Sequence, residues 1–248
     1  MPTTLITRPS ASDAADAAAD ALVATLRGAV AAHGVASVAF SGGSTPGPMF
    51  RALAASDLDW SDVHVFQVDE RIAADGDPDR NLTGLRSVLL GPARVPDSNV
   101  HIMPVDVFFS TDLSTENENG RATAAQQGAL ADYSSALTRV CGGVLDVVHL
   151  GLGDDGHTAS LVPDDPVLDV RDRDVAVTHP YKGHRRMTLT FEVLDRARLV
   201  LWLVAGASKV AVLPELLAGS ELIPAGRVRA ADAVVFCDAA AAAAVPSD

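Results

Sequence analysis

Apolar and polar positions along the chain follow two recurring patterns: short continuous apolar runs, and longer segments in which apolar residues return at helical spacing. The clearest helical segment covers residues 10–33, where Ala, Leu and Val form one face and aspartates mark the other. Ser10 or Ser12 is suited to begin this helix and Gly34 to end it. We therefore predict a long amphipathic helix close to the start of the sequence.

The continuous apolar runs predict strands that are buried on both faces. They cover residues 3–7, 36–40, 63–68, 101–103, 145–150, 175–178, 186–190, 199–204 and 234–236. Further helices are predicted at residues 82–90 and 122–140 and from Ser208 onward, and residues 110–120 form a polar loop. This alternation predicts an α/β fold with a mostly parallel sheet covered by helices on both faces. Because neither an internal repeat nor a long linker occurs, we expect one domain over residues 1–248.

The amino-acid composition excludes some classes of binding partner for this protein. The 248 residues carry 19 Lys and Arg against 32 Asp and Glu, a net charge of −13, with no run of five basic residues. Such a chain repels nucleic acid and anionic membrane surfaces, and its apolar runs are too short to cross a bilayer. Cys141 and Cys237 show no metal-binding spacing and are expected to be unpaired buried thiols. With no signal-peptide pattern at the N-terminus, these features predict a cytoplasmic protein without nucleic-acid or membrane partners.

A glycine-rich loop follows the strand at 36–40. It reads Ser41-Gly42-Gly43-Ser44-Thr45-Pro46 and precedes a helix, so that backbone amides and the helix N-terminus can bind a phosphate. The loop lacks the lysine of a P-loop and the GxGxxG spacing of a dinucleotide fold. Taken alone, it is explained equally well as a structural turn.

A second motif, Gln67-Val68-Asp69-Glu70-Arg71, ends the strand at 63–68. Open α/β sheets bind ligands at this end of their strands. Arg71 is suited to bind a phosphate, with Asp69 or Glu70 orienting it. The alternative is an ordinary salt bridge in solvent.

The most specific motif follows the strand at 145–150 and reads Gly151-Leu152-Gly153-Asp154-Asp155-Gly156-His157-Thr158-Ala159-Ser160. It presents a histidine, the side chain best suited to accept a proton near neutral pH, two positions after a carboxylate that can hold its ring. A metal site is not favoured, because His149 lies inside the preceding strand. Ser160 is not part of a GxSxG elbow, so water activated by His157 is a simpler nucleophile. A purely structural histidine is the alternative.

Basic residues form a fourth group. Lys182, Arg185 and Arg186 precede the strand at 186–190, and Lys209 lies at a predicted helix start. In so acidic a chain they can complete an anion site, although each is individually explained as a solvated charge.

Together these segments resemble the three signature segments of the 6-phosphogluconolactonase family, from Ser41 to Pro46, from Asp69 to Arg71 and from Gly151 to Pro163. Residues 186–190, 205–209 and Pro224 are similar to the family's C-terminal blocks. Order and spacing agree from about Leu5 to Ala242.

The resemblance implies a modified Rossmann-like three-layer sandwich shared with glucosamine-6-phosphate deaminase and ribose-5-phosphate isomerase. It implies hydrolysis of a phosphorylated sugar lactone, 6-phospho-D-glucono-1,5-lactone, in the oxidative pentose phosphate pathway, without metal or organic cofactor, and a functional link to glucose-6-phosphate dehydrogenase. By resemblance, His157 is the catalytic base, with Asp155 beside it. The implied substrate-binding residues are Gly42, Gly43, Ser44, Thr45, Asp69, Arg71, Gly156, Arg186 and Lys209.

Two positions depart from the family pattern. Arg80-Asn81 stands where the family has Ser-Asn, which leaves the role of Arg80 open, and Asp154 occupies the variable position before Asp-Gly-His. A deaminase remains an alternative, although it carries a tyrosine at the position of Arg71 and a carboxylate at that of Val162. A non-catalytic sugar-phosphate sensor is a third possibility, which turnover would exclude.

Overall fold

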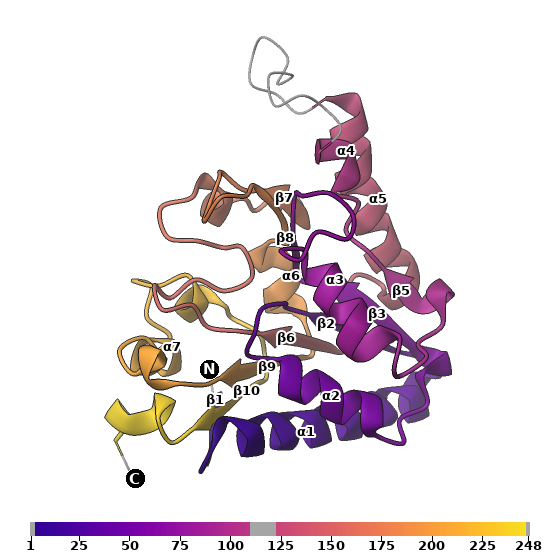
Figure 1. Cartoon of the computed structure of the whole chain (residues 1–248). Coiled ribbons are helices and arrows are strands. Elements are labelled where there is room, and N and C mark those ends of the chain that lie inside the picture. Colours follow the sequence, from indigo (N-terminus) through magenta and orange to yellow (C-terminus); the bar gives the residue numbers. More distant parts are fainter. Residues whose placement is uncertain (1–2, 110–122, 247–248) are drawn as a thin grey trace.

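The computed structural model describes residues 3–109 and 123–246, so the predicted loop at 110–120 lies outside the described residues. The described strands form two sheets, one of seven strands and one of three (Figure 1). Every pairing within the larger sheet is parallel, in the order β1-β10-β9-β6-β2-β3-β5. Its strands are β1 (Thr3–Arg8), β2 (Ala36–Phe40), β3 (Val63–Gln67), β5 (Val100–His101), β6 (Val147–Leu150), β9 (Leu199–Val204) and β10 (Ala233–Asp238).

The predicted mostly parallel sheet with helices on both faces is confirmed. The helices are α1 (Ala11–His33), α2 (Gly47–Ala55), α3 (Asn81–Leu85), α4 (Asp106–Phe109), α5 (Ala124–Cys141), α6 (Phe191–Arg196) and α7 (Leu213–Leu217). The long helix α1 begins and ends as predicted. The Ser10 hydroxyl accepts the Asp13 N–H at 3.2 Å, and Gly34, at φ 86°, closes the last turn.

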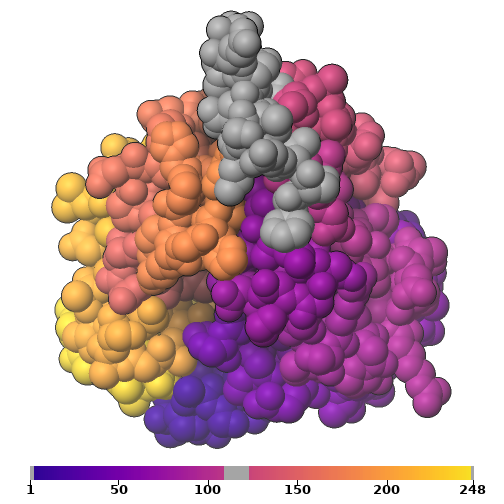
Figure 2. Space-filling model, turned by 45° about the horizontal axis from the view of Figure 1, so that its top comes forward, coloured from indigo at the N-terminus to yellow at the C-terminus, as the bar shows by residue number. Residues whose placement is uncertain are grey.

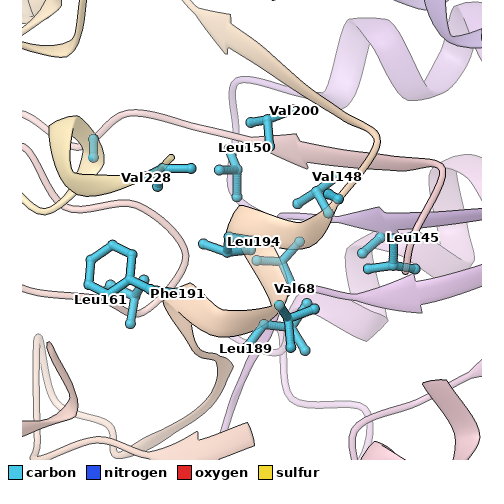
Figure 3. Packing of buried hydrophobic residues seen from close by; sticks show 14 of the residues in the cluster. Val68, Leu145, Val148, Leu150, Leu161, Leu189, Phe191, Leu194, Val200 and Val228 are labelled. Carbon is cyan, nitrogen blue, oxygen red and sulfur yellow. The ribbon is translucent and has the colours of Figure 1, made fainter. Parts of the chain in front are cut away.

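Two hydrophobic clusters lie on opposite faces of the larger sheet. Helices α1 and α2 pack on one face, whereas α5, α6 and α7 contribute to the cluster on the other. Strand β6 supplies both, because Val147 faces the first cluster and Val148 and Leu150 the second. Figure 3 shows Val148 and Leu150 close to Leu194 of α6. Burial on both faces explains why these strands are continuous apolar runs.

The smaller sheet contains the strands predicted at 175–178 and 186–190, together with one strand that was not predicted. It contains β4 (Asp69–Arg71), β8 (Arg186–Leu189) and β7 (Val175–Val177), which pair antiparallel. The chain leaves the larger sheet at Val68, whose N–H donates to the Phe40 carbonyl at 3.0 Å and whose carbonyl accepts the Leu189 N–H at 2.8 Å. Val68 therefore joins the two sheets, and the Asp-Glu-Arg motif is a strand of the second one.

Two predicted helices also differ. The segment at 82–90 is α3 followed by a π-helical turn (Arg86–Leu90), with the Gly91 N–H bonded to the Arg86 carbonyl at 3.0 Å. The helix expected from Ser208 is a 3₁₀ turn (Ala207–Lys209), and α7 starts only at Leu213. Proline lacks an N–H and is tolerated only in the first helical turn, so Pro214 fixes the start of α7 close to its own position.

Both cysteines are unpaired, as expected, but only Cys237 is fully buried. Cys141, at the end of α5, is half-buried. In residues 3–109 and 123–246, no helix is both long and apolar enough for a membrane span.

Candidate active site

A cavity of about 310 Å³ opens at the carboxyl ends of the central parallel strands. From β2 the chain continues to β3 on one side of the sheet, while β6 lies on the other side, so this is a topological switch point. The cavity is lined by residues 41–46, by Asp69 and Arg71 of β4 with Asn81, by His149, by residues 151–154 with His157 and Ala159, and by Lys182, Arg186, Leu203 and Lys209. In Figure 2 the indigo and purple parts of the chain face the orange part across a hollow.

Nine of the eleven predicted site residues line this cavity, although they come from distant parts of the sequence. They are Gly42, Gly43, Ser44, Thr45, Asp69, Arg71, His157, Arg186 and Lys209. The other two, Asp155 and Gly156, are not part of the lining. Asp155 bonds the His157 ring, and Gly156 is buried against Ile223.

The loop after β2 needs both of its glycines. Gly43 has φ 99°, a backbone conformation that side chains disfavour. A Cβ on Gly42 would lie 2.1 Å from Asn81 Oδ1, so Asn81 can pack against the loop only because position 42 is glycine. The loop leads directly into α2, whose N-terminal end favours an anion.

Glu70 organises the segment that presents Arg71. Its carboxylate is fully buried and accepts four N–H groups at 2.7–2.9 Å. The donors are the Gln67 side chain and the backbone of Arg71, Asn81 and Leu82. The expected orientation of Arg71 by an acidic neighbour therefore acts on its backbone. The Arg71 guanidinium instead donates through Nη1 to the Asp79 carbonyl, and its buried Nε has no partner.

Asp69 ties three segments together beside the cavity. It accepts the Ser160 hydroxyl at 2.6 Å and the Asn81 amide at 3.2 Å. Ser160 is thus engaged by a carboxylate rather than by a histidine, which agrees with the expectation that it is no nucleophile.

Arg80, where the chain departs from the family pattern, does not line the cavity. Its side chain is 1% exposed and bonds the Asp106 carboxylate at 2.7 Å, with Glu70 at 3.8 Å. It links the segment between β4 and α3 to α4.

The His157 turn is compact. The Gly153 N–H donates to the His157 carbonyl at 2.8 Å, and His157 Nδ1 lies 2.5 Å from Asp155 Oδ1. A Cβ on Gly153 would lie 2.1 Å from His157 Nδ1 and 2.6 Å from Asp155 Oδ1, so glycine there makes room for the imidazole–carboxylate contact. The His157 side chain is 19% exposed, which leaves it accessible from the cavity.

The ionisation of Asp155 defines the histidine tautomer. Burial alone would raise the pKa of Asp155, but hydrogen bonds from Tyr181 and His157 outweigh it and lower the pKa to about 2. An ionised carboxylate only accepts hydrogen bonds, so Nδ1 of the neutral imidazole carries the proton and Nε2 has a free lone pair. Nε2 is then the atom that can accept a proton.

Positive charge dominates the cavity. Its lining includes four cations, Arg71, Lys182, Arg186 and Lys209, and two carboxylates, Asp69 and Asp154. Burial lowers the pKa of Arg186, and the nearby Asp69 carboxylate opposes this. Of the predicted basic group only Arg185 lies outside the lining, and its Nε donates to the Thr178 carbonyl at 3.4 Å.

Buried side-chain atoms without a partner also concentrate here. In residues 3–109 and 123–246 there are seven such nitrogen and oxygen atoms, and six belong to cavity residues. These residues are Ser41, Arg71, Asn81, His149 and Arg186. Because an unpaired buried polar atom is costly, this concentration indicates a site for a ligand rich in oxygen.

His149 is one functional candidate that the sequence analysis missed. It was placed inside the strand, but its ring lines the cavity, and neither ring nitrogen has a partner. Burial lowers the pKa of His149 to about 3, so the ring is neutral. The alternation of side chains along β6, which sends His149 to the face opposite Leu150, was the available signal.

The described residues offer no group of three or more His, Cys, Asp or Glu side chains that could hold a metal ion.

Comparison with known proteins gives a consistent result. Residues 9–237 match the family described as glucosamine-6-phosphate isomerases/6-phosphogluconolactonase. A 6-phosphogluconolactonase of Synechocystis is 40% identical over 190 residues, covering 77% of this chain and 75% of that protein. The human GDH/6PGL endoplasmic bifunctional protein is 38% identical over 195 residues, covering 77% of this chain but 23% of that longer protein.

Solved structures extend the likeness to the whole fold. The 6-phosphogluconolactonase of Leishmania guyanensis has a TM-score of 0.83 at 26% identity, with 100% of both chains covered. A monomeric glucosamine-6-phosphate deaminase has a TM-score of 0.77 at 17% identity, covering 98% of this chain and 100% of that one. The fold shared with the deaminases, expected from the sequence, is confirmed.

Proposed function

Since the chain belongs to the glucosamine-6-phosphate isomerase/6-phosphogluconolactonase family, we propose that it hydrolyses 6-phospho-D-glucono-1,5-lactone to 6-phosphogluconate in the oxidative pentose phosphate pathway. One observation carries this proposal: an Asp155–His157 pair borders a cavity that holds four cations in a chain of net charge −13. The pair supplies a base, and the cations suit a phosphorylated substrate.

The substrate phosphate would bind between the glycine-rich loop and the cations. Ser44 and Thr45 offer hydroxyl groups, while Arg71 and Lys209 offer charge-assisted hydrogen bonds from the facing side. Anchoring the phosphate in this way fixes the sugar several bonds away, so that its C1 carbonyl lies next to His157.

The chemical step would be attack of water on the C1 carbonyl. His157 Nε2 accepts a proton from water as the oxygen bonds to C1, and Asp155 steadies the imidazolium that forms. The bond between C1 and the ring oxygen then breaks, and the imidazolium returns the proton to that oxygen. The products are the open-chain acid and the unchanged enzyme. Asp69, Gly42, Gly43 and Arg186 would complete the substrate contacts.

A deaminase activity lacks the side chains that it requires. Ring opening and isomerisation of an amino sugar need a further carboxylate as acid–base partner. Position 162 is a buried valine, 6% exposed, and position 71 is an arginine. Lactone hydrolysis uses only the groups present.

The first prediction tests the base directly. Exchange of His157→Asn should reduce turnover of the lactone roughly 10²–10⁴-fold, the usual contribution of a positioned base, and leave binding of 6-phosphogluconate nearly unchanged. Turnover is measured by acid release, with spontaneous hydrolysis subtracted, and binding by calorimetry.

His179→Asn is the matched control, because His179 is exposed and outside the cavity lining. It should keep full activity. Wild-type turnover in His157→Asn would contradict the mechanism, and ammonia release from glucosamine 6-phosphate without lactone turnover would contradict the function.

The supply of substrate suggests a partner reaction. A sugar lactone forms when C1 of a phosphorylated aldose is oxidised, so a dehydrogenase must precede this enzyme. The human relative, whose name joins GDH and 6PGL in one protein, supports a functional link to glucose-6-phosphate dehydrogenase. We further propose a cytoplasmic location, because both cysteines are unpaired, and a single catalytic domain, because one hydrophobic cluster includes residues of both sheets.

A further inference from the structure

Tyr181 completes a row of three hydrogen-bonded side chains at the site. Its hydroxyl donates to Asp155 Oδ2 at 2.7 Å, while the other carboxylate oxygen, Oδ1, bonds His157 Nδ1 at 2.5 Å. Oδ1 also accepts the His157 backbone N–H at 3.1 Å. The Tyr181 hydroxyl lies 3.5 Å from His157 Nδ1, so the shorter hydrogen bonds connect the two side chains through Asp155. Nothing in the spacing of the sequence pairs Tyr181 with Asp155, which lies 26 positions earlier.

The tyrosine is held firmly in place. It lies in the connection between β7 and β8, where its N–H donates to the His184 carbonyl at 2.9 Å. The Arg186 guanidinium carbon lies 5.1 Å from the centre of its ring and the Lys182 ammonium 5.0 Å, both within cation–π range. The connection between two strands of the smaller sheet thus places the Tyr181 hydroxyl against Asp155, which lies in the turn after β6 of the larger sheet.

We propose that Tyr181 is a positioning residue that acts through Asp155 on the base. Asp155 is 35% exposed in its side chain, and without the Tyr181 hydroxyl its carboxylate would be held only at Oδ1, by the backbone N–H and ring of His157. The Tyr181 hydroxyl fixes the plane of the carboxylate, and the carboxylate fixes the imidazole with Nε2 towards the cavity. The inference rests on the proposed role of His157 as general base.

The hydrogen bond from Tyr181 to Asp155 also affects how strongly the Asp155 carboxylate stabilises the protonated His157 ring. A hydroxyl donated to Oδ2 draws negative charge away from Oδ1, so without it the imidazolium form of His157 is held more strongly. The acid limb of activity, where the base becomes protonated, then moves to higher pH. The other charged groups around the pair are Asp69, Arg71, Asp154, Lys182, Arg186 and Lys209, of which Lys182 also interacts with the Tyr181 hydroxyl.

The test is Tyr181→Phe, which removes the hydroxyl and keeps the ring that contacts Lys182 and Arg186. We expect kcat to fall roughly three- to tenfold with KM unchanged, and the acid limb to move up by roughly 0.3–1 pH unit, the equivalent of one hydrogen bond. Tyr133→Phe is the matched control. It removes the other tyrosine hydroxyl, which is buried and bonded to Gln67, and should leave the acid limb in place.

Two further measurements separate this inference from its alternatives. In an Asp155→Asn background, Tyr181→Phe should cause a much smaller additional loss of kcat, because only the 3.5 Å approach of its hydroxyl to His157 Nδ1 then remains. An NMR titration of the His157 ring in the free protein should show the same upward movement of the midpoint, without any lactone present.

A full loss in the double variant would overturn the inference, because Tyr181 would then contact the substrate itself. An unchanged acid limb and an unchanged NMR midpoint in Tyr181→Phe would overturn it as well. If the midpoint moves but the wild-type protein shows no lactone turnover, the positioning role stands and the proposed function fails.

Discussion

Arg71, like Arg186, is a cavity cation whose guanidinium the protein already holds at one nitrogen. Nη1 donates to the Asp79 carbonyl, and the buried Nε has no partner. A guanidinium held at one nitrogen and unpaired at another loses little conformational freedom when an anion binds. This geometry favours Arg71 as a fixed phosphate contact.

Replacement of Arg71 by alanine should therefore weaken binding more than chemistry. We expect KM for the lactone and Kd for 6-phosphogluconate to rise on the order of 10–100-fold, which corresponds to about 1.5–3 kcal/mol for a charge-assisted contact, with kcat changed little. Arg185→Ala serves as control, because Arg185 is outside the cavity lining. A large fall in kcat at unchanged KM would show that Arg71 acts on the transition state instead.

At the scale of elements, the crossing of the chain between the two sheets depends on one buried carboxylate. Glu70 lies in β4 and bonds the first two backbone N–H groups of α3, Asn81 and Leu82. No helical carbonyl is available to these N–H groups at a helix start. Glu70 thus provides hydrogen-bond acceptors for the first N–H groups of α3 and holds β4 beside this helix.

Exchange of Glu70→Gln would replace one acceptor oxygen by a donor that faces backbone N–H groups. We expect the free energy of unfolding to fall on the order of 2–3 kcal/mol, measured by urea denaturation, because buried hydrogen bonds to a charged group are lost. Glu192→Gln is the matched control: its pair with Arg171, at 3.7 Å, is exposed and should contribute less than about 1 kcal/mol. Equal stability of the two variants would contradict the role given to Glu70.

The elements that the sequence predicted best are those with the strongest local signals. Strands such as β2 and β9 are buried on both faces and therefore read as continuous apolar runs, and α1 carries its own caps. In the smaller sheet, β7 and β8 were predicted as strands, but β4 was not, because it is the polar triplet Asp-Glu-Arg and its antiparallel pairing with β8 depends on contacts distant in sequence.

The same distinction applies to the site. Residues in glycine-rich turns and strand ends, such as Ser44 and His157, could be found because the local sequence signals a special backbone. Tyr181 and Asn81 reach the site through packing between separate segments, and periodicity carries no information on such contacts. Their roles emerge only when the two sheets are placed side by side.

At the scale of the whole molecule, the cavity carries a net positive charge, whereas the chain as a whole is negatively charged. Four cations and two carboxylates line the cavity, whereas the net charge is −13. The excess of cations at the cavity therefore favours an anionic substrate there, although the chain as a whole is acidic.

Lactone hydrolysis should not depend on a divalent ion. Attack on an activated ester needs a base and an oriented water, and the described residues hold no cluster of metal-ligating side chains. Dialysis against a strong chelator should leave kcat unchanged after correction for spontaneous hydrolysis. A loss of activity that zinc or magnesium restores would refute this expectation.

The pairing of β1 with β10 has a consequence for how the protein is made. Thr7 lies opposite Cys237 in this pair, 230 positions further along the chain. At roughly 5–20 residues per second on the ribosome, β1 remains without its neighbour for on the order of ten to fifty seconds. During that time α1 can already cover β2 and β3, since they share one hydrophobic cluster. Synthesis therefore imposes an order on assembly: the centre of the sheet can form early, and the edge strand made first is the one that waits longest for its partner.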